Sequence, residues 1–295
     1  MKVMTLLPAA TEIVAALGGA DQLVGISHEC DFPPTLGAIP RVTATPIDPA
    51  ASSAVIDAEV RALREAGRAV IAVDAAVLRR LAPDLIVTQD LCEVCAVADG
   101  EIHRLASALP DPPTVLSLSG RTLAGVWQDI RRVSRALELG DDGDALVARL
   151  VSRLERLAVS APPHRPRVLC IEWLDPPYLA GHWIPELVEA AGGQDVGARA
   201  GTHSMRTTWS DMAALRPDLV IVMLCGFGVE RSLMELEALR NADTWHLLPT
   251  APVWVLDGNA YTSRPGPRLV DGAERLQAAM LGQEMDGLVR WRPHR

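Results

Sequence analysis

The segment Leu81-Ala-Pro-Asp-Leu-Ile-Val-Thr-Gln-Asp-Leu-Cys92 has a second copy, Leu215-Arg-Pro-Asp-Leu-Val-Ile-Val-Met-Leu-Cys225, and this repeat decides the fold. In each copy Pro-Asp ends a helix, because proline cannot donate a hydrogen bond into the helical ladder. The apolar run that follows is short and rich in branched residues, which predicts a strand buried on both faces. Ligands of open α/β sheets bind beyond the carboxyl ends of such strands. The repeat therefore predicts two lobes that face each other across a cleft.

Composition describes an ordinary globular protein that is long enough for two domains. Of 295 residues, 49% are hydrophobic and 22% are charged, which allows a substantial core. The net charge of -9 disfavours nucleic acid as the main partner. No apolar stretch is long enough to span a bilayer, and no signal peptide precedes Pro8. We therefore expect a cytoplasmic protein, or a periplasmic or extracellular one if the sequence was trimmed.

Predicted strands and helices alternate in both halves of the chain, which implies parallel, right-handed α/β units. The elements predicted from local patterns include a helix over 75–81 and strands over 114–118 and 253–256. One long amphipathic helix is predicted over 122–139. The expected organisation is an N-terminal lobe over 1–120, a connecting helix and linker over 121–165, a C-terminal lobe over 166–283 and a tail over 284–295, in which 289–295 has no readable structure.

Cys92 and Cys95 form a Cys-x-x-Cys pair directly after the first repeat strand. Such a pair can bind zinc or iron, or undergo thiol redox chemistry. A closed four-ligand metal site would need further ligands from afar, such as Cys225. The alternative is two small buried residues at a turn, because unpaired cysteines are among the most buried residues.

The segment 172–183 concentrates aromatic and polar side chains beside a double proline. Rigid aromatic faces at strand ends suit a large flat ligand, and core packing is the alternative. His28, His182 and His203 fall in predicted loops where a histidine could ligate a metal centre axially, although a surface or hydrogen-bonded structural histidine is the more frequent case. The candidate contacts in the segment are Glu172, Trp173, His182 and Trp183.

A loop over 257–268, stiffened by glycine and proline, holds Arg264 and Arg268. Arginine there suits amide or phosphate acceptors, and a salt bridge is the alternative. The sequence contains no Ser-His-Asp arrangement, no phosphate-binding P-loop and no G-x-G-x-x-G.

Several segments occur in the order of a known family. They are Thr5-Leu-Leu-Pro-Ala-Ala-Thr-Glu12, Leu23-Val-Gly-Ile-Ser27, Asp31-Phe-Pro-Pro34, the two Pro-Asp-Leu strands, Ala190-Ala-Gly-Gly193 and Arg264-Pro-Gly-Pro-Arg268. Together they resemble the cobalamin- and ferric-siderophore-type substrate-binding proteins of ABC importers, and the vitamin B12-binding type is nearest. The resemblance covers nearly the whole chain.

The resemblance implies an α/β fold of class III, in which two Rossmann-like lobes with parallel sheets are joined by a single long backbone helix. It implies a monomer that is not an enzyme and that binds cobalamin or a related corrinoid between its lobes. Haem or a ferric chelate such as a siderophore is the alternative ligand, and an ABC permease is the implied partner. The implied contacts are His28, Phe32, Gln89, Glu172, Trp173, Trp209, Tyr261 and Arg264. Asp90 is a further candidate because it stands at the end of a predicted strand.

Two departures from the family pattern accompany the resemblance. Family members dock the permease through a surface glutamate on each lobe, but Ala76 stands at that place in the first lobe and Ser210 or Asp211 in the second. The chain also lacks an export signal. The alternative function is a cytoplasmic metal-binding or redox enzyme that uses Cys92, Cys95 and Cys225.

Overall fold

The repeat forms the central strand of the main sheet in each half of the chain. A computed structural model describes residues 1–90, 99–241 and 250–292. Strand β5 (Leu85–Gln89) lies between β1 (Val3–Thr5) and β6 (Thr114–Leu118). Strand β11 (Leu219–Val222) lies between β7 (Arg167–Leu174) and β12 (Val253–Leu256). All four pairings are parallel and both central strands are buried throughout, which confirms the buried strands predicted from the repeat.

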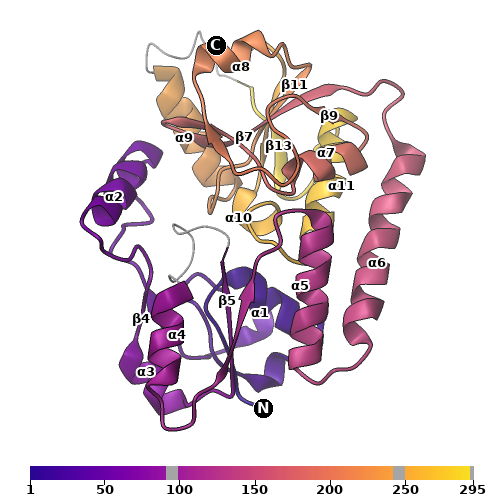
Figure 1. Ribbon diagram of the computed structural model, residues 1–295. Coiled ribbons are helices and arrows are strands. Elements are labelled where there is room, and N and C mark those ends of the chain that lie inside the picture. The colour runs from indigo at the N-terminus through magenta and orange to yellow at the C-terminus, as the bar shows by residue number, and fades with distance from the viewer. Residues whose placement is uncertain (91–98, 242–249, 293–295) are drawn as a thin grey trace. The chain divides into compact units, whose positions relative to one another are not determined.

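The chain divides into two compact units (Figure 1). Unit 1 comprises Met1–Ala51, Ala58–Gly120 and Ala124–Ala148, and unit 2 comprises Ser52–Asp57, Arg121–Leu123 and Arg149–Arg295. The helix expected over 122–139 is α5 (Leu123–Ala136), most of which belongs to unit 1. The chain passes from one unit to the other within α2 (Ser53–Glu65) and within α6 (Asp142–Leu157).

Unit 1 is built on a parallel sheet with the strand order β2-β1-β5-β6. Figure 1 shows α3 and α4 on one side of β5 and α1 and α5 on the other. Proline opens α1, where its fixed φ suits the first helical position. The remaining elements are α1 (Pro8–Ala16), β2 (Leu23–Gly25), β3 (Thr43–Ala44), β4 (Ala72–Val73), α3 (Ala75–Leu81) and α4 (Asp99–Ser107), with 3₁₀ turns at Ala20–Gln22 and Pro34–Leu36.

The core of unit 1 joins this sheet to the helices on one of its faces. Met4 and Leu6 from β1 and the segment after it lie with Ile86 of β5 in one buried cluster. Leu78 of α3 and Ile102 of α4 complete the cluster and are almost entirely buried. The central strand is therefore covered by apolar side chains along its length.

Unit 2 has a mixed sheet with the strand order β10-β8-β7-β11-β12-β13, and β9 also pairs with β7. Its centre is parallel as expected, but β8, β10 and β13 run antiparallel to their neighbours. The tail expected to lack structure contains β13, which pairs with β12 and places buried Trp291 in the core. These strands are β8 (Pro177–Leu179), β9 (Gln194–Asp195), β10 (Met205–Arg206) and β13 (Leu288–Arg290).

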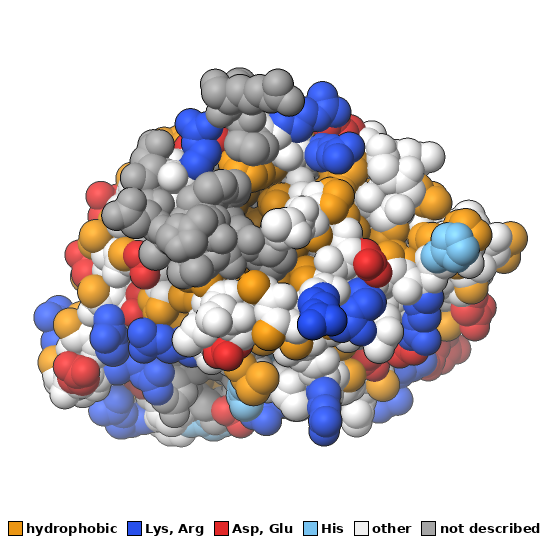
Figure 2. All heavy atoms as spheres, turned by 90° about the horizontal axis from the view of Figure 1, so that it is seen from above, with side chains coloured by type: hydrophobic (Ala, Val, Ile, Leu, Met, Phe, Trp, Pro, Cys, Tyr) orange, Lys and Arg blue, Asp and Glu red, His pale blue; other side chains and the backbone are white. Residues whose placement is uncertain are grey.

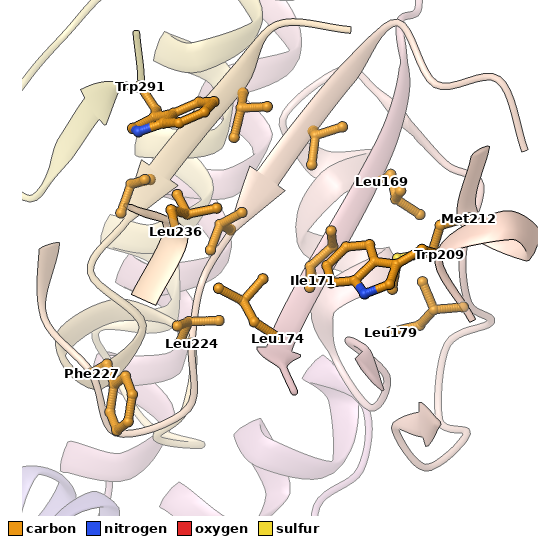
Figure 3. Close-up of a cluster of buried hydrophobic side chains, with 14 residues drawn as sticks. Leu169, Ile171, Leu174, Leu179, Trp209, Met212, Leu224, Phe227, Leu236 and Trp291 are labelled. Atoms are coloured by element: carbon orange, nitrogen blue, oxygen red, sulfur yellow. The ribbon is translucent and has the colours of Figure 1, made fainter. Parts of the chain in front are cut away.

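The helices of unit 2 enclose a large apolar cluster (Figure 3). Ile171 and Leu169 of β7 lie in it with Trp209 and Met212 of α8 and Leu236 of α9. On the other helices, α7 and α11 pack against each other. The helices are α7 (Ile184–Ala190), α8 (Trp209–Ala214), α9 (Val229–Asn241), α10 (Gly258–Tyr261) and α11 (Leu269–Met280), with a 3₁₀ turn at Ala158–Ser160.

In both copies of the repeat, the aspartate after proline holds a residue at the start of the neighbouring strand, Lys2 directly before β1 and Arg167 as the first residue of β7. The N–H of Lys2 donates to Oδ2 of Asp84 at 2.7 Å, and the N–H of Asp84 donates to the carbonyl of Lys2 at 2.8 Å. The N–H of Arg167 donates to Oδ2 of Asp218 at 2.8 Å, and the N–H of Asp218 returns a bond of 2.8 Å to the carbonyl of Arg167. Each pair of bonds aligns the central strand with its neighbour.

We expect Asp218→Ala to lower the free energy of unfolding by about 1 kcal/mol, because the amide of Arg167 loses its carboxylate acceptor at a strand end that water can reach. Urea denaturation followed by circular dichroism measures the change. Asp111→Ala, at an exposed loop aspartate, is the matched control and should unfold at the parent midpoint. Identical midpoints for all three proteins would show that the carboxylate does not stabilise the sheet.

Asp195, at the end of β9, is a buried carboxylate with an unusual environment. Its Oδ1 accepts the N–H groups of Gly197 and Ala198 at 2.8 and 2.9 Å, while Oδ2 is buried without a hydrogen-bond partner among the described atoms. Burial raises the pKa of Asp195 to about 6, although the two backbone hydrogen bonds act in the opposite direction. The folded protein therefore binds this proton more tightly than the unfolded chain does.

The free energy of unfolding should fall as pH rises from 3.8 to about 6 and stay level above that range, because the folded pKa of Asp195 lies above the unfolded value. The expected loss is on the order of 2 kcal/mol. Asp195→Asn keeps an acceptor for both N–H groups and should remove the contribution of Asp195 to the pH dependence of the free energy of unfolding. Urea titrations across the range test the prediction, and parallel pH profiles for the two proteins would contradict it.

Candidate functional site

In unit 1, predicted ligand contacts follow the carboxyl ends of two strands. Gln89 is the last residue of β5 and is buried, whereas Asp90 is exposed and donates its N–H to the carbonyl of Leu118 at 2.8 Å. His28 follows β2, which is separated from β5 in the sheet by β1. Because the three strands are parallel, their carboxyl ends form one edge, and the predicted residues lie along it.

His28 is oriented by a hydroxyl group. Nδ1 of its ring lies 2.6 Å from Oγ1 of Thr43, and its backbone N–H donates to the same oxygen at 3.0 Å. Nε2 of the ring is buried and has no hydrogen-bond partner among the described atoms. Nearby in sequence, Phe32 is 38% exposed. His28 and Phe32 stay predicted ligand contacts: the ring of His28 is oriented by Thr43, and the side chain of Phe32 is partly exposed.

In unit 2, Trp173 and Phe227 form an aromatic pair beyond the parallel strands. Their ring centroids are 5.3 Å apart and their planes are inclined by 51°. The guanidinium carbon of Arg231 lies 4.7 Å from the centre of the Phe227 ring, and Arg231 contacts Glu235 at 3.5 Å. Phe227 is buried but Trp173 is only half-buried, so Trp173 is the member that can present a face to a ligand.

A short segment from the first half of the sequence supports this pair. Ser53 donates its N–H and its hydroxyl to Oε2 of Glu235 at 3.1 and 2.6 Å. The indole N–H of Trp173 donates to the carbonyl of Ser53 at 3.2 Å, and also to the carbonyl of Asp175 at 3.1 Å. Ile56 packs against the core of unit 2. Sequence analysis missed Ser53 and Glu235, because the two residues are 182 positions apart and neither lies in a recognisable motif.

Ser53→Ala should loosen the 52–57 segment, because the hydroxyl that meets the mostly buried carboxylate of Glu235 is lost. We expect the amides of this segment to exchange with solvent roughly tenfold faster, as the loss of one charge-assisted hydrogen bond predicts. Ser52→Ala is the control, since the exposed Ser52 hydroxyl makes only a 3.4 Å contact with the N–H of Val55. Hydrogen-exchange mass spectrometry decides, and equal exchange in both variants would contradict the anchoring role.

Tyr261 and Arg264, in and after α10, have polar groups that are engaged inside unit 2. The guanidinium carbon of Arg275 lies 3.6 Å from the centre of the Tyr261 ring, and Arg275 donates to the Tyr261 hydroxyl at 2.9 Å. Arg268 approaches the same ring at 4.9 Å. Arg264 is 5% exposed and donates to Oδ1 of Asn259 at 2.8 Å. Both residues have a structural role here, and their contact with a ligand stays a prediction.

Two further predicted contacts are core residues. Trp183 is buried and donates its indole N–H to the carbonyl of Thr262 at 2.9 Å. Trp209 is 8% exposed, and Figure 3 shows its ring lying against Ile171 and close to Met212. Packing accounts for both tryptophans, so we leave them out of the proposed site.

Glu172 and Cys225 lie on neighbouring chain segments. The N–H of Cys225 donates to the carbonyl of Glu172 at 3.0 Å, and both side chains are half-buried. Cys92 and Cys95 lie outside the described residues. Among the residues that are described, no three His, Cys, Asp or Glu side chains come together as a metal site. A role for Cys225 in metal binding stays a prediction.

A cavity of about 450 Å³ opens in unit 2 beside the end of β12. Three acidic residues and one basic residue, Arg231, line it, so the cavity offers charged groups of both signs. Sequence analysis did not single out Asp286 and Gly287, which close one side after α11. The lining residues are Gly228, Val229, Glu230, Arg231, Asp257, Asp286 and Gly287.

His182 and His203 form a second polar cluster in unit 2. Their ring centroids are 5.3 Å apart and their planes are nearly perpendicular, at 86°. Burial and, to a smaller extent, the positive charges of His203 and Arg121 together lower the pKa of His182 to about 4. His182 is therefore neutral at physiological pH. Its Nε2 is buried without a hydrogen-bond partner among the described residues.

Basic and acidic side chains are interspersed with apolar ones on the face seen in Figure 2. No continuous basic surface is visible among the side chains coloured there, in agreement with the net charge of -9. In the described part of the chain, no helix has the length and apolar character needed to cross a membrane.

Comparison with known proteins relates the chain to one family. The family model described as "Periplasmic binding protein" matches residues 76–251, which include both copies of the repeat. No curated protein matches the chain.

Solved structures with the same fold cover almost the whole chain. A periplasmic heme-binding protein from Pseudomonas aeruginosa is 19% identical, with a TM-score of 0.73, and the match covers 100% of this chain and 99% of that one. The vitamin B12-binding protein BtuF of Vibrio cholerae is 19% identical, with a TM-score of 0.64 and coverage of 95% and 96%. An ABC transporter substrate-binding protein from Listeria monocytogenes EGD-e is 17% identical, with a TM-score of 0.66 and coverage of 94% and 97%.

Proposed function

Because this chain belongs to the periplasmic binding protein family, we propose that it binds a flat metal chelate, cobalamin or a related corrinoid or else haem, and delivers it to an ABC importer. The α/β fold is that of the class III members of the family. The family consists of binding proteins, so the prediction that the chain is not an enzyme is confirmed. It is also a family of periplasmic proteins, which gives the expectation of a cytoplasmic location no support.

The half-exposed face of Trp173 is the observation that carries the proposal. An indole that is braced by Phe227 on one side and hydrogen-bonded through Nε1 on its edge is held in one orientation. A fixed aromatic face stacks well on a planar macrocycle, because little side-chain entropy remains to be lost on binding. One of the similar structures is a heme-binding protein and another is a vitamin B12-binding protein, and both ligands contain such a macrocycle around a metal.

The other proposed contacts supply polar groups and a further aromatic face. In unit 1 they are the residues along the carboxyl edge of the sheet, and in unit 2 they are Glu172 and the loop that follows β12. A ferric siderophore would use the same polar groups but would gain little from a flat aromatic face. The set comprises His28, Phe32, Gln89, Asp90, Glu172, Trp173, His182, Tyr261 and Arg264.

Binding of hydroxocobalamin and of haemin to the purified protein tests the proposal directly. We expect one of them to bind at micromolar concentration or below and to change its visible spectrum. Trp173→Ala should weaken that binding roughly ten- to hundredfold, because one stacked aromatic face is lost. Trp209→Phe, a core substitution in the same unit, should lower thermal stability but keep the parent affinity. If neither compound binds, or if Trp173→Ala binds as well as the parent, the proposal is wrong.

Delivery to a permease would use the helices that precede the two repeat strands. Ala76 in α3 and Ser210 and Asp211 in α8 are exposed, as a docking surface requires. Asp211 also accepts the hydroxyl of Thr208 at 2.7 Å and so helps to cap α8. Because only α8 offers a carboxylate at the expected place, we propose that α8 makes the stronger of the two contacts.

A further inference from the structure

The imidazole of His182 is held in place, and one of its nitrogens has no hydrogen-bond partner in the part of the chain that the structure describes. The backbone of His182 is left-handed, with φ of 53°. Its N–H donates to the carbonyl of Thr202 at 2.6 Å, and its carbonyl accepts the N–H of Gly201 at 2.8 Å. The ring also contacts Trp183, with centroids 5.5 Å apart. Buried polar atoms in folded proteins almost always have a partner, so the lone buried Nε2 points to a group that arrives from outside the chain.

The surroundings of this nitrogen favour a negatively charged group. His203 lies against the ring, and Arg121 is close enough for its charge to act on His182. Both of these side chains are exposed and can move to admit a ligand. The nearest acid along the chain is Glu186, whose carboxylate already accepts the N–H of Leu123 at 2.7 Å. The basic side chains of His203 and Arg121 therefore surround a buried nitrogen, Nε2 of His182, that has no partner among the described residues.

We propose that His182, His203 and Arg121 bind an oxyanion of the carboxylate or phosphate class. An oxygen of the anion accepts a hydrogen bond from Nε2 of His182, and the imidazole of His203 and the guanidinium of Arg121 supply further donors. The positive charges of His203 and Arg121 disfavour protonation of His182, and the same charges attract an anion. A metal ion fits less well, because it would stand beside Arg121 and no third ligand is present among the described residues.

The oxyanion has two chemical sources. A free anion such as phosphate or acetate would make this a separate site that goes beyond the proposed function. A propionate of bound haem would make it part of the proposed site, and that alternative rests on the proposed function. Cobalamin carries amides in place of most carboxylates, so the second source would also favour haem as the ligand.

Nuclear magnetic resonance of the imidazole groups tests the inference on the full chain. Addition of phosphate or acetate, each at constant ionic strength, should shift the His182 resonances saturably. The pKa of His182 should rise from about 4 by roughly 1–3 units, as a nearby opposite charge predicts. Haemin and haemin dimethyl ester separate the two sources, because only haemin offers free carboxylates. A free-anion site responds to phosphate or acetate alone, whereas a propionate site responds to haemin and not to its ester.

Matched variants show whether His182 itself is responsible. His182→Asn tolerates the left-handed backbone but cannot reach the position of Nε2, so it should abolish saturable anion binding. Arg121→Gln should weaken binding about tenfold, and His164→Asn, at an exposed linker histidine, should not change it. Thermal unfolding confirms that each variant is folded. The inference is overturned if no anion gives a saturable shift, if His182→Asn binds as well as the parent, or if only zinc shifts the resonances. Haemin binding to a protein whose His182 responds to none of phosphate, acetate and haemin would overturn this inference and leave the proposed function intact.

Discussion

Both units depend on one constraint, a pair of hydrogen bonds at the start of a strand. In each unit the aspartate of Pro-Asp makes these bonds with a residue at the start of the neighbouring strand. In each copy the residue before proline is left-handed, with φ of 43° at Ala82 and 47° at Arg216. That conformation ends the helix and turns the chain, and the aspartate then fixes the register at the amino end of the sheet. Because strand residues follow one another at a constant rise, a fixed start also fixes where each strand ends. Proposed ligand contacts at strand ends, such as Gln89 of β5 and Trp173 of β7, inherit their positions from this arrangement.

Much of the fold could be predicted from the sequence, and the successful elements share a physical basis. The helix α3 and the strands β6 and β12 have the predicted bounds, because proline, aspartate and short branched runs act locally at their ends. The strands β8, β10 and β13 could not be predicted in the same way. Each has only two or three residues and exists because a longer neighbour offers its edge, which is information that local patterns do not carry.

The candidate site was predictable only in part, for a related reason. The concentration of aromatic residues at and after the end of β7 identified Trp173, but the same signal also selected Trp183, which is a core residue. Composition cannot distinguish an aromatic side chain that faces a ligand from one that fills a core, because both surroundings are apolar. The partners that fix Trp173 and Tyr261, namely Ser53 and Arg275, are remote in sequence or lie on a helix with no distinguishing pattern. Only the folded chain brings them together.

The assignment of Ser52–Asp57 to unit 2 has a consequence for how the protein is made. Ser53 leaves the ribosome 182 residues before Glu235, the side chain that holds it. At translation rates of about 5–20 residues per second, the interval is on the order of 10–40 s. During that time unit 1 can gather its own strands while α2 lacks its anchor. The second unit is completed by a piece of chain synthesised long before the rest of it, so a cut within α6 would not release two independent folding modules.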